Sequence, residues 1–207
     1  MRTFEYRVHF ALALAGILLA RQSAACEPPA GFIDPPRPEI APLDSLLSHT
    51  EEREIALPLS AVMQNANRPL RIDATKDLPG VKGTFRLSSG PYGTVGARRL
   101  VCLTDGSRSV EEVLLTESNG GGNRFRYVVW NHTSPKFRNV AYAVGEFVRT
   151  QPAPDKTRVS WTYRFALKSG VSAEEESHFR KTFLEQEFAV WMRTQMDRRE
   201  PEPAARP

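Results

Sequence analysis

The chain has 207 residues and a formal net charge of +4, with 28 basic and 24 acidic side chains. Without the three arginines and one glutamate of residues 1–25, it holds 25 basic and 23 acidic residues, with both signs interspersed along the body. That pattern is typical of a solvated globular surface, and it excludes the basic stripe of a nucleic-acid-binding protein. The length suits one domain with tails.

Residues 1–25 have the composition of an export signal. Arg2 and Arg7 precede an apolar run at 8–20, and small residues stand directly before Cys26. Thirteen residues of helix reach only about 20 Å, which is less than the roughly 30 Å of a bilayer core. We therefore predict an exported protein, either periplasmic or anchored to the membrane and facing the periplasm. A retained N-terminal anchor helix is the alternative.

The two cysteines leave more than one interpretation open. Cys26 stands where bacterial lipoproteins carry their lipid, but Ser23 takes the place of the leucine usual in that signal. Lipidation of Cys26 and plain signal cleavage are therefore both considered, and one lipid chain alone anchors a protein weakly. Cys102 lies in a predicted strand, where a small buried hydrophobe is the favoured interpretation and a disulfide with Cys26 the alternative.

Proline sets off the segment that follows the signal. Six prolines lie between residues 26 and 42, so we predict an extended spacer with no fold of its own at 26–47. The folded domain is expected at 48–198, and residues 199–207 are expected to form a disordered tail.

Seven β-strands and one short helix are predicted in the first part of the domain. Alternating polar and apolar side chains, bounded by turn residues, place the strands at 52–57, 82–88, 95–103, 108–116, 125–131, 139–149 and 157–167. The short helix, at 61–67, separates the first two strands. Because short turns join the later strands in order, an antiparallel sheet is expected.

Residues 173–197 are predicted to form one long amphipathic helix. Ser172 and Glu175 have the spacing of a capping box, which satisfies free N–H groups at the helix start. Its broad apolar face comprises Phe179, Phe183, Leu184, Phe188, Val190, Trp191 and Met192. So many large apolar groups would not face water, and the helix is expected to lie across the sheet.

This order of elements resembles the START-like, or SRPBCC, superfamily, in particular its polyketide cyclase/dehydrase-like branch. The matching segments are 57–62, 96–101, 105–107, 110–114 and 139–146, together with the last strand and the long helix. The resemblance implies an α+β helix-grip fold, in which a seven-stranded antiparallel sheet wraps around a long C-terminal helix over an apolar cavity. It also implies a small hydrophobic ligand, lipid-like or polyketide-like.

The hairpin predicted from the strands at 95–103 and 108–116 carries candidate polar groups for that cavity. Matching positions to the family suggests Glu111 as an inward carboxylate, with Val113 on its side of the strand. Arg99 shares its side with Val101 and could pair with Glu111 or hold an anionic head group. A desolvated Glu111 would have a raised pKa and could act as an acid, whereas a structural ion pair at the rim is the favoured interpretation.

Aromatic side chains are the remaining candidates for the ligand site. Trp161, Tyr163 and Phe165 alternate along the last strand, and the helix contributes Phe183. Tyr127 and Tyr142 are expected on inward faces of earlier strands. Ordinary core packing is the alternative for all of them, although core and cavity wall coincide in this fold.

The expected function is that of an exported protein that binds a small hydrophobic ligand between sheet and helix. An enzyme of the cyclase or hydrolase kind, using Glu111 or a tyrosine as acid or base, is one alternative. An envelope interaction module with a filled core is another. His132 has no second His or Cys at ligand spacing, so no metal is predicted, and no cofactor motif is present. The oligomeric state is not predicted.

Overall fold

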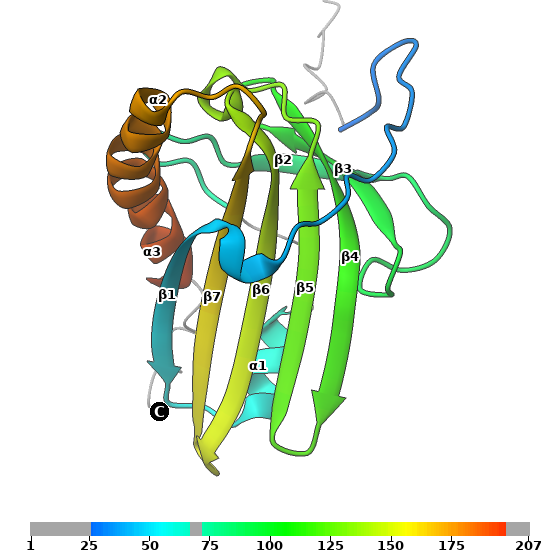
Figure 1. Ribbon diagram of the computed structural model, residues 1–207. Coiled ribbons are helices and arrows are strands. Elements are labelled where there is room, and N and C mark those ends of the chain that lie inside the picture. The colour runs from blue at the N-terminus through cyan, green and yellow to red at the C-terminus, as the bar shows by residue number, and fades with distance from the viewer. Residues whose placement is uncertain (1–25, 67–71, 198–207) are drawn as a thin grey trace, which may run out of the picture.

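The computed structural model describes residues 26–66 and 72–197 and has the expected α+β helix-grip arrangement (Figure 1). The strands are β1 (Leu47–Ile55), β2 (Val81–Arg86), β3 (Arg98–Leu103), β4 (Arg108–Asn119), β5 (Gly122–Trp130), β6 (Val140–Ala153) and β7 (Lys156–Leu167). All pair antiparallel in one sheet with the order β1-β7-β6-β5-β4-β3-β2. The predicted signal at 1–25 and tail at 199–207 lie outside the described residues.

The two faces of the sheet bury different sets of side chains. We call the face covered by the C-terminal helix the inner face, where Tyr127, Val129, Trp161 and Phe165 pack against that helix. The opposite, outer face buries a smaller cluster around Leu100, which also contains Val110, Val128, Trp130, Tyr142 and Val144. Because successive side chains of a strand point to opposite faces, the alternation in the sequence decides which residue meets which cluster.

The C-terminal helix follows the expected bounds but changes its winding midway. Its parts are α2 (Ala173–His178), a π-helical segment (Phe179–Phe188) and α3 (Ala189–Asp197). The capping box is confirmed: Glu175 N donates to Ser172 Oγ at 3.2 Å, and Ser172 N donates to Glu175 Oε2 at 2.9 Å.

The π-helical winding brings the aromatic residues of the helix to one side. Phe179 and Phe188 are nine residues apart, which is about two and a half turns of an α-helix and would place them on opposite sides. The wider i→i+5 turn of a π-helix corrects that offset. Both side chains are buried, whereas Val190, which was expected on the apolar face, is 46% exposed.

Among residues 26–66 and 72–197, three short helices complete the fold, and no helix is both long and apolar enough to span a membrane. A 3₁₀ turn, η1 (Leu43–Ser45), precedes β1, and a second, η2 (Pro135–Phe137), lies between β5 and β6. The short helix α1 (Leu59–Ala66) lies on the far side of the sheet in Figure 1, in contact with β6 and β7.

The prediction of a free spacer before the domain is wrong. Residues 26–46, which we call the N-terminal strap, cross the near, outer face of the sheet in Figure 1. Ala41 N donates to the Tyr142 hydroxyl at 2.9 Å, and the Asp34 carboxylate pairs with Arg98 at 2.8 Å. Five strap side chains pack against the outer cluster: Cys26, Phe32, Ile40, Leu43 and Leu46. Proline keeps most of the strap out of helices and strands, while these apolar groups bind it to the sheet.

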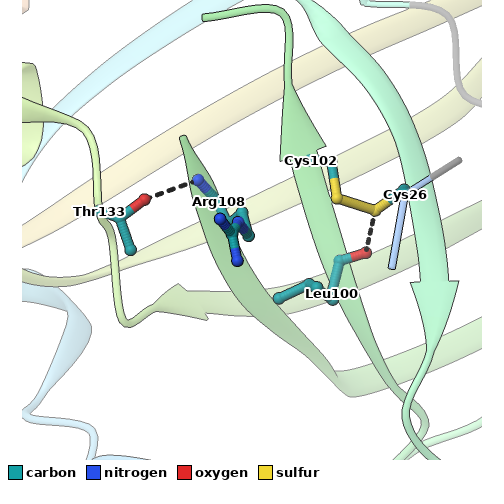
Figure 2. The surroundings of a disulfide bond; sticks show 5 residues. All are labelled: Cys26, Leu100, Cys102, Arg108 and Thr133. Atoms are coloured by element: carbon teal, nitrogen blue, oxygen red, sulfur yellow. Dashed lines mark hydrogen bonds between the residues drawn. A yellow bond between two sulfur atoms is a disulfide. The ribbon is translucent and has the colours of Figure 1, made fainter. Parts of the chain in front are cut away.

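A disulfide fastens the start of the strap to β3 (Figure 2). Cys26 and Cys102 are joined with their Cα atoms 5.5 Å apart, so the interpretation of Cys102 as a lone buried hydrophobe is wrong. Cys26 Sγ lies 3.8 Å from the Leu100 carbonyl oxygen. The disulfide occupies the sulfur that a lipid would need, so lipidation of Cys26 is incompatible with this structure.

The segment 72–80 is joined to both the helix and the sheet. Gln195 in α3, only 2% exposed, accepts from Asp73 N at 3.0 Å and donates to Asp73 O at 2.9 Å. At its other end, Gly80 N donates to Thr104 Oγ1 at 3.1 Å, and Val81 N donates to Ile72 O at 2.7 Å. These bonds satisfy buried backbone groups, so the segment is a fixed wall.

Candidate functional site

An ion pair joins two of the candidate residues on the inner face. Arg99 in β3 and Glu111 in β4 stand opposite each other in the register. Arg99 Nε donates to Glu111 Oε2 at 2.6 Å, and the Tyr92 hydroxyl donates to the same oxygen at 3.0 Å. The Arg99 guanidinium also lies over the Tyr92 ring, 3.7 Å from its centroid. Tyr92, in the loop between β2 and β3, was not predicted as a site residue.

The charged groups of this cluster are matched by one another. Burial alone would lower the pKa of Arg99, but the Glu111 carboxylate raises it above its ordinary value. The Glu111 carboxylate accepts a charge-assisted hydrogen bond from Arg99, which holds the two side chains together. Burial, followed by the charge of Glu111, raises the pKa of Tyr92 well above 10, so its hydroxyl remains a donor.

Two tyrosine hydroxyls meet beside the ion pair. Tyr127 in β5 donates its hydroxyl hydrogen to the Tyr163 hydroxyl oxygen at 2.7 Å, and the two rings are perpendicular. Burial, then Tyr127 and Glu111, raises the pKa of Tyr163 well above 10. A phenol with so high a pKa stays protonated near neutral pH. It therefore donates hydrogen bonds and is unsuited to act as a base.

A glycine in β6 makes room for this pair. A Cβ atom on Gly145 would lie 2.3 Å from Tyr127 Cζ and 2.6 Å from its hydroxyl oxygen. The tip of Tyr127 therefore rests against bare backbone. The signal in the sequence was a glycine inside an otherwise apolar strand, which often marks a close approach of this kind.

The predicted aromatic site residues of the inner face are all buried, but to different degrees. Trp161 and Phe165 are each only 1% exposed, which fits the core interpretation. Tyr127, Tyr163 and Phe183 keep 6%, 8% and 6% of their surface, although they lie between sheet and helix. Val101 and Val113 are buried beside the ion pair. For these residues a role in ligand binding remains a prediction.

Tyr142 was placed on the wrong face. Its side chain belongs to the outer cluster and accepts a hydrogen bond from the strap. The register between β6 and β7 shifts between Val140 and Tyr142, so a β-bulge reverses the alternation at this point. Val140 therefore faces inward while Tyr142 faces outward.

A cleft of about 970 Å³ opens at the start of the C-terminal helix. Segment 74–79, Thr104, Asp105 and the β5–β6 connection form one side, and residues of α2 and the π-helical segment form the other. Leu78, Phe179 and Phe183 are the large apolar residues along it, and Phe183 alone of the predicted site residues lines it. Its volume lies near the upper end of ordinary small-molecule sites.

An aromatic path, by which we mean a series of ring contacts, connects Phe183 at this cleft to the tyrosine pair. The Phe183 ring stacks on Phe188 with centroids 5.6 Å apart, and Phe188 meets Tyr163 edge-on at 5.0 Å. Beside the path, Lys136 of η2 pairs with Glu187 of the helix at 2.8 Å. The cleft was missed because irregular connections form half of it, and these carry no periodic pattern.

His132 lies outside this path and is half-buried. Its ring stacks on Phe137 at 4.7 Å, and Nδ1 lies 2.9 Å from Ser109 Oγ. Burial, with help from the charge of Lys168, lowers its pKa from 6.5 to about 4. Among the described residues, no three His, Cys, Asp or Glu side chains gather into a metal-binding group.

We expect His132 to make the fold sensitive to mild acid. Its folded-state pKa lies below the unfolded value, so its contribution to stability is complete above pH 6.5 and is lost as pH falls towards 4. The loss should be about 2 kcal/mol, because the ring keeps some contact with solvent. Urea unfolding between pH 7 and 4 measures it. The slope should be smaller in His132→Gln and unchanged in His178→Gln, whose histidine is exposed.

Comparison with known proteins adds to this description only at the level of the fold. No family model and no curated protein matches the chain. Similar solved structures include a START superfamily protein from Mycobacterium smegmatis, 12% identical with a TM-score of 0.47, over 73% of this chain and 97% of that one. Ara h 8.0201 is 11% identical with a TM-score of 0.46, over 73% and 99% of the two chains.

A third similar structure is a point mutant of norcoclaurine synthase from Thalictrum flavum in complex with a transition-state analogue. It is 13% identical with a TM-score of 0.47, over 74% of this chain and 98% of that one. At these identities the likeness concerns the fold alone. The class that the structure defines is therefore a helix-grip protein with an internal polar cluster and an open cleft.

Proposed function

We propose that this chain is an exported protein that binds a small hydrophobic ligand between the inner face of the sheet and the C-terminal helix. The cleft beside Phe179 and Phe183 carries the proposal, because two aromatic side chains of the helix that belong to the inner-face core line it. Apolar burial at about 25 cal/mol per Å² would supply the affinity. The polar cluster of Tyr92, Arg99, Glu111, Tyr127 and Tyr163 would fix the orientation.

The disulfide supports the exported location. Disulfides persist in oxidising compartments and are rare in the cytosol. Cys26 directly follows the predicted signal, so the bond with Cys102 suits a chain that is cut close to Cys26 and then folds outside the cytoplasm.

Intact-mass spectrometry of the protein from its own host tests both parts of the proposal. Under denaturing conditions we expect a chain that lacks residues 1–25 and is two hydrogen atoms lighter than its dithiol form. Under native conditions we expect an added mass that organic solvent removes. A full-length, reduced chain would contradict export, and a native mass equal to that of the bare chain would count against a retained ligand.

Phe183→Ala should weaken the binding of an apolar fluorescent probe by roughly tenfold, because it removes the aromatic group that cleft and interior share. Titration monitored by fluorescence measures the dissociation constant. Val190→Ala is the matched control, since Val190 belongs to the same helix and is 46% exposed. Equal affinities for the two variants would place the probe elsewhere.

A further inference from the structure

The geometry points to a ligand with one neutral hydrogen-bond acceptor, such as a carbonyl oxygen on an otherwise apolar skeleton, that receives the Tyr163 hydroxyl hydrogen. This inference rests on the proposed function and refines it. It names the chemical class of the ligand and assigns different roles to two tyrosines. Tyr163 would contact the ligand, and Tyr127 would position Tyr163.

The first step is the direction of the hydrogen bond between the tyrosines. Tyr127 donates and the Tyr163 oxygen accepts at 2.7 Å. Within residues 26–66 and 72–197, the hydrogen of the Tyr163 hydroxyl has no acceptor. A buried donor without an acceptor is costly, so a ligand that brings an acceptor gains from filling this place.

The second step is that the chain is shaped to hold the pair in this arrangement. The missing Cβ of Gly145 leaves the space that the tip of Tyr127 fills. Phe125 flanks the Tyr127 ring at 5.7 Å, and Phe188 closes on Tyr163 at 5.0 Å. Both rings are therefore confined. Because the Tyr163 oxygen accepts a hydrogen bond from Tyr127, the hydrogen of the Tyr163 hydroxyl can point in only a few directions. That is how a positioning residue orients a donor.

The third step is the charge balance around the pair. The Arg99 guanidinium is already matched by Glu111, and Tyr92 donates to the same carboxylate oxygen. The guanidinium of Arg149, also on the inner face, lies near the β4–β5 hairpin and donates to Asn123 at 2.8 Å. Among the described residues that meet at the two tyrosines, the charges of Arg99 and Glu111 are therefore already matched by each other, and a ligand carboxylate or ammonium placed there would be buried without a partner, which is expensive.

Four naphthalenes of similar size test the inference by isothermal titration with the full chain. They are 2-acetylnaphthalene, 2-isopropylnaphthalene, 2-naphthoic acid and 2-naphthylmethylamine at pH 7. We expect the ketone to bind about tenfold more tightly than the hydrocarbon, which is the scale of one buried hydrogen bond. The acid and the amine should bind more weakly than the ketone.

Variants separate the two tyrosines. Tyr163→Phe should remove the tenfold preference for the ketone and leave the affinity for the hydrocarbon unchanged. Tyr127→Phe and Gly145→Ala should reduce the same preference, because each disturbs the orientation of Tyr163. Tyr142→Phe is the matched control, since its hydroxyl serves the strap on the outer face, and it should keep the preference.

The outcomes distinguish this inference from the function on which it rests. If ketone and hydrocarbon bind equally well, or if the acid or amine binds most tightly, the neutral-acceptor inference is wrong while ligand binding stands. If none of the four binds, the proposed function fails as well. The wild-type series alone decides the ligand class, so a Tyr163→Phe chain that does not fold leaves that test intact.

Discussion

Replacing Cys102 by alanine should lower the free energy of unfolding by about 4 kcal/mol, one of the two largest effects that we expect from a single substitution. The disulfide joins residues 76 positions apart, and closing so long a loop restricts the unfolded chain strongly. In addition, the strap would lose its fixed end. Phe32 and Ile40 would then cover the outer cluster only part of the time.

Urea unfolding with and without a reducing agent measures this effect. Reductant should bring the wild-type protein to the stability of Cys102→Ala, and it should leave the variant unchanged. Cys26→Ala should behave in the same way. Equal unfolding midpoints for the oxidised wild type and Cys102→Ala would show that the bond contributes nothing to the fold.

Hydrogen exchange would show which part of the domain loosens when the disulfide is removed. The amide of Ala41 in the strap donates to the hydroxyl of Tyr142 in the sheet. The exchange rate of this amide therefore shows whether the strap is packed against the sheet. We expect faster exchange at Ala41 in Cys102→Ala, while the amides of β5 and β6 at the centre of the sheet stay protected. The strap would then be the first part of the domain to open.

Most of the sheet could be predicted because alternation decides the face of each strand residue. In β7 the pattern from Val159 to Phe165 is unbroken, and the structure buries these residues as expected. The same rule placed Arg99 opposite Glu111. It fails at Tyr142, where one extra residue in β6 shifts the register, and nothing in the local sequence announces a bulge there.

The strap shows the limit of reasoning from composition. The prolines predicted an extended spacer, but a prediction of backbone shape says nothing about what the chain touches. The apolar residues Phe32, Ile40 and Leu43 are spaced too irregularly for a strand or a helix, and the outer cluster of the sheet is what they pack against. Contacts between an irregular segment and a sheet face depend on distant residues, which no local pattern contains.

The candidate site was predictable only in part for a related reason. Glu111 and Tyr163 lie on regular strands and could be assigned a face from the sequence. Tyr92 reaches Glu111 from a loop, and the cleft depends on segment 74–79, whose course is set by bonds to Gln195 and Thr104. Long-range hydrogen bonds of this kind fix irregular backbone without leaving a periodic signal.

The second large effect is expected at Gly80, the last residue of segment 72–80. Gly80→Ala should lower the free energy of unfolding by about 3 kcal/mol, which is at the upper end of the usual cost of overpacking. A Cβ atom there would lie 2.5 Å from Ala74 N and 2.6 Å from Ile72 O. Both atoms belong to the backbone, so no side-chain rotation relieves the contact. The segment 72–80 must move instead, and with it one wall of the cleft.

Gly120→Ala is the matched control for this prediction, because a Cβ atom at the β4–β5 tip meets nothing within 4 Å. It should leave stability unchanged or raise it slightly, since alanine reduces the freedom of the unfolded chain. Urea unfolding gives both free energies, and titration with an apolar probe shows whether binding is lost as well. A Gly80→Ala chain as stable as Gly120→Ala would mean that segment 72–80 yields easily. A stable variant that nevertheless loses the probe would identify this wall as part of the ligand site.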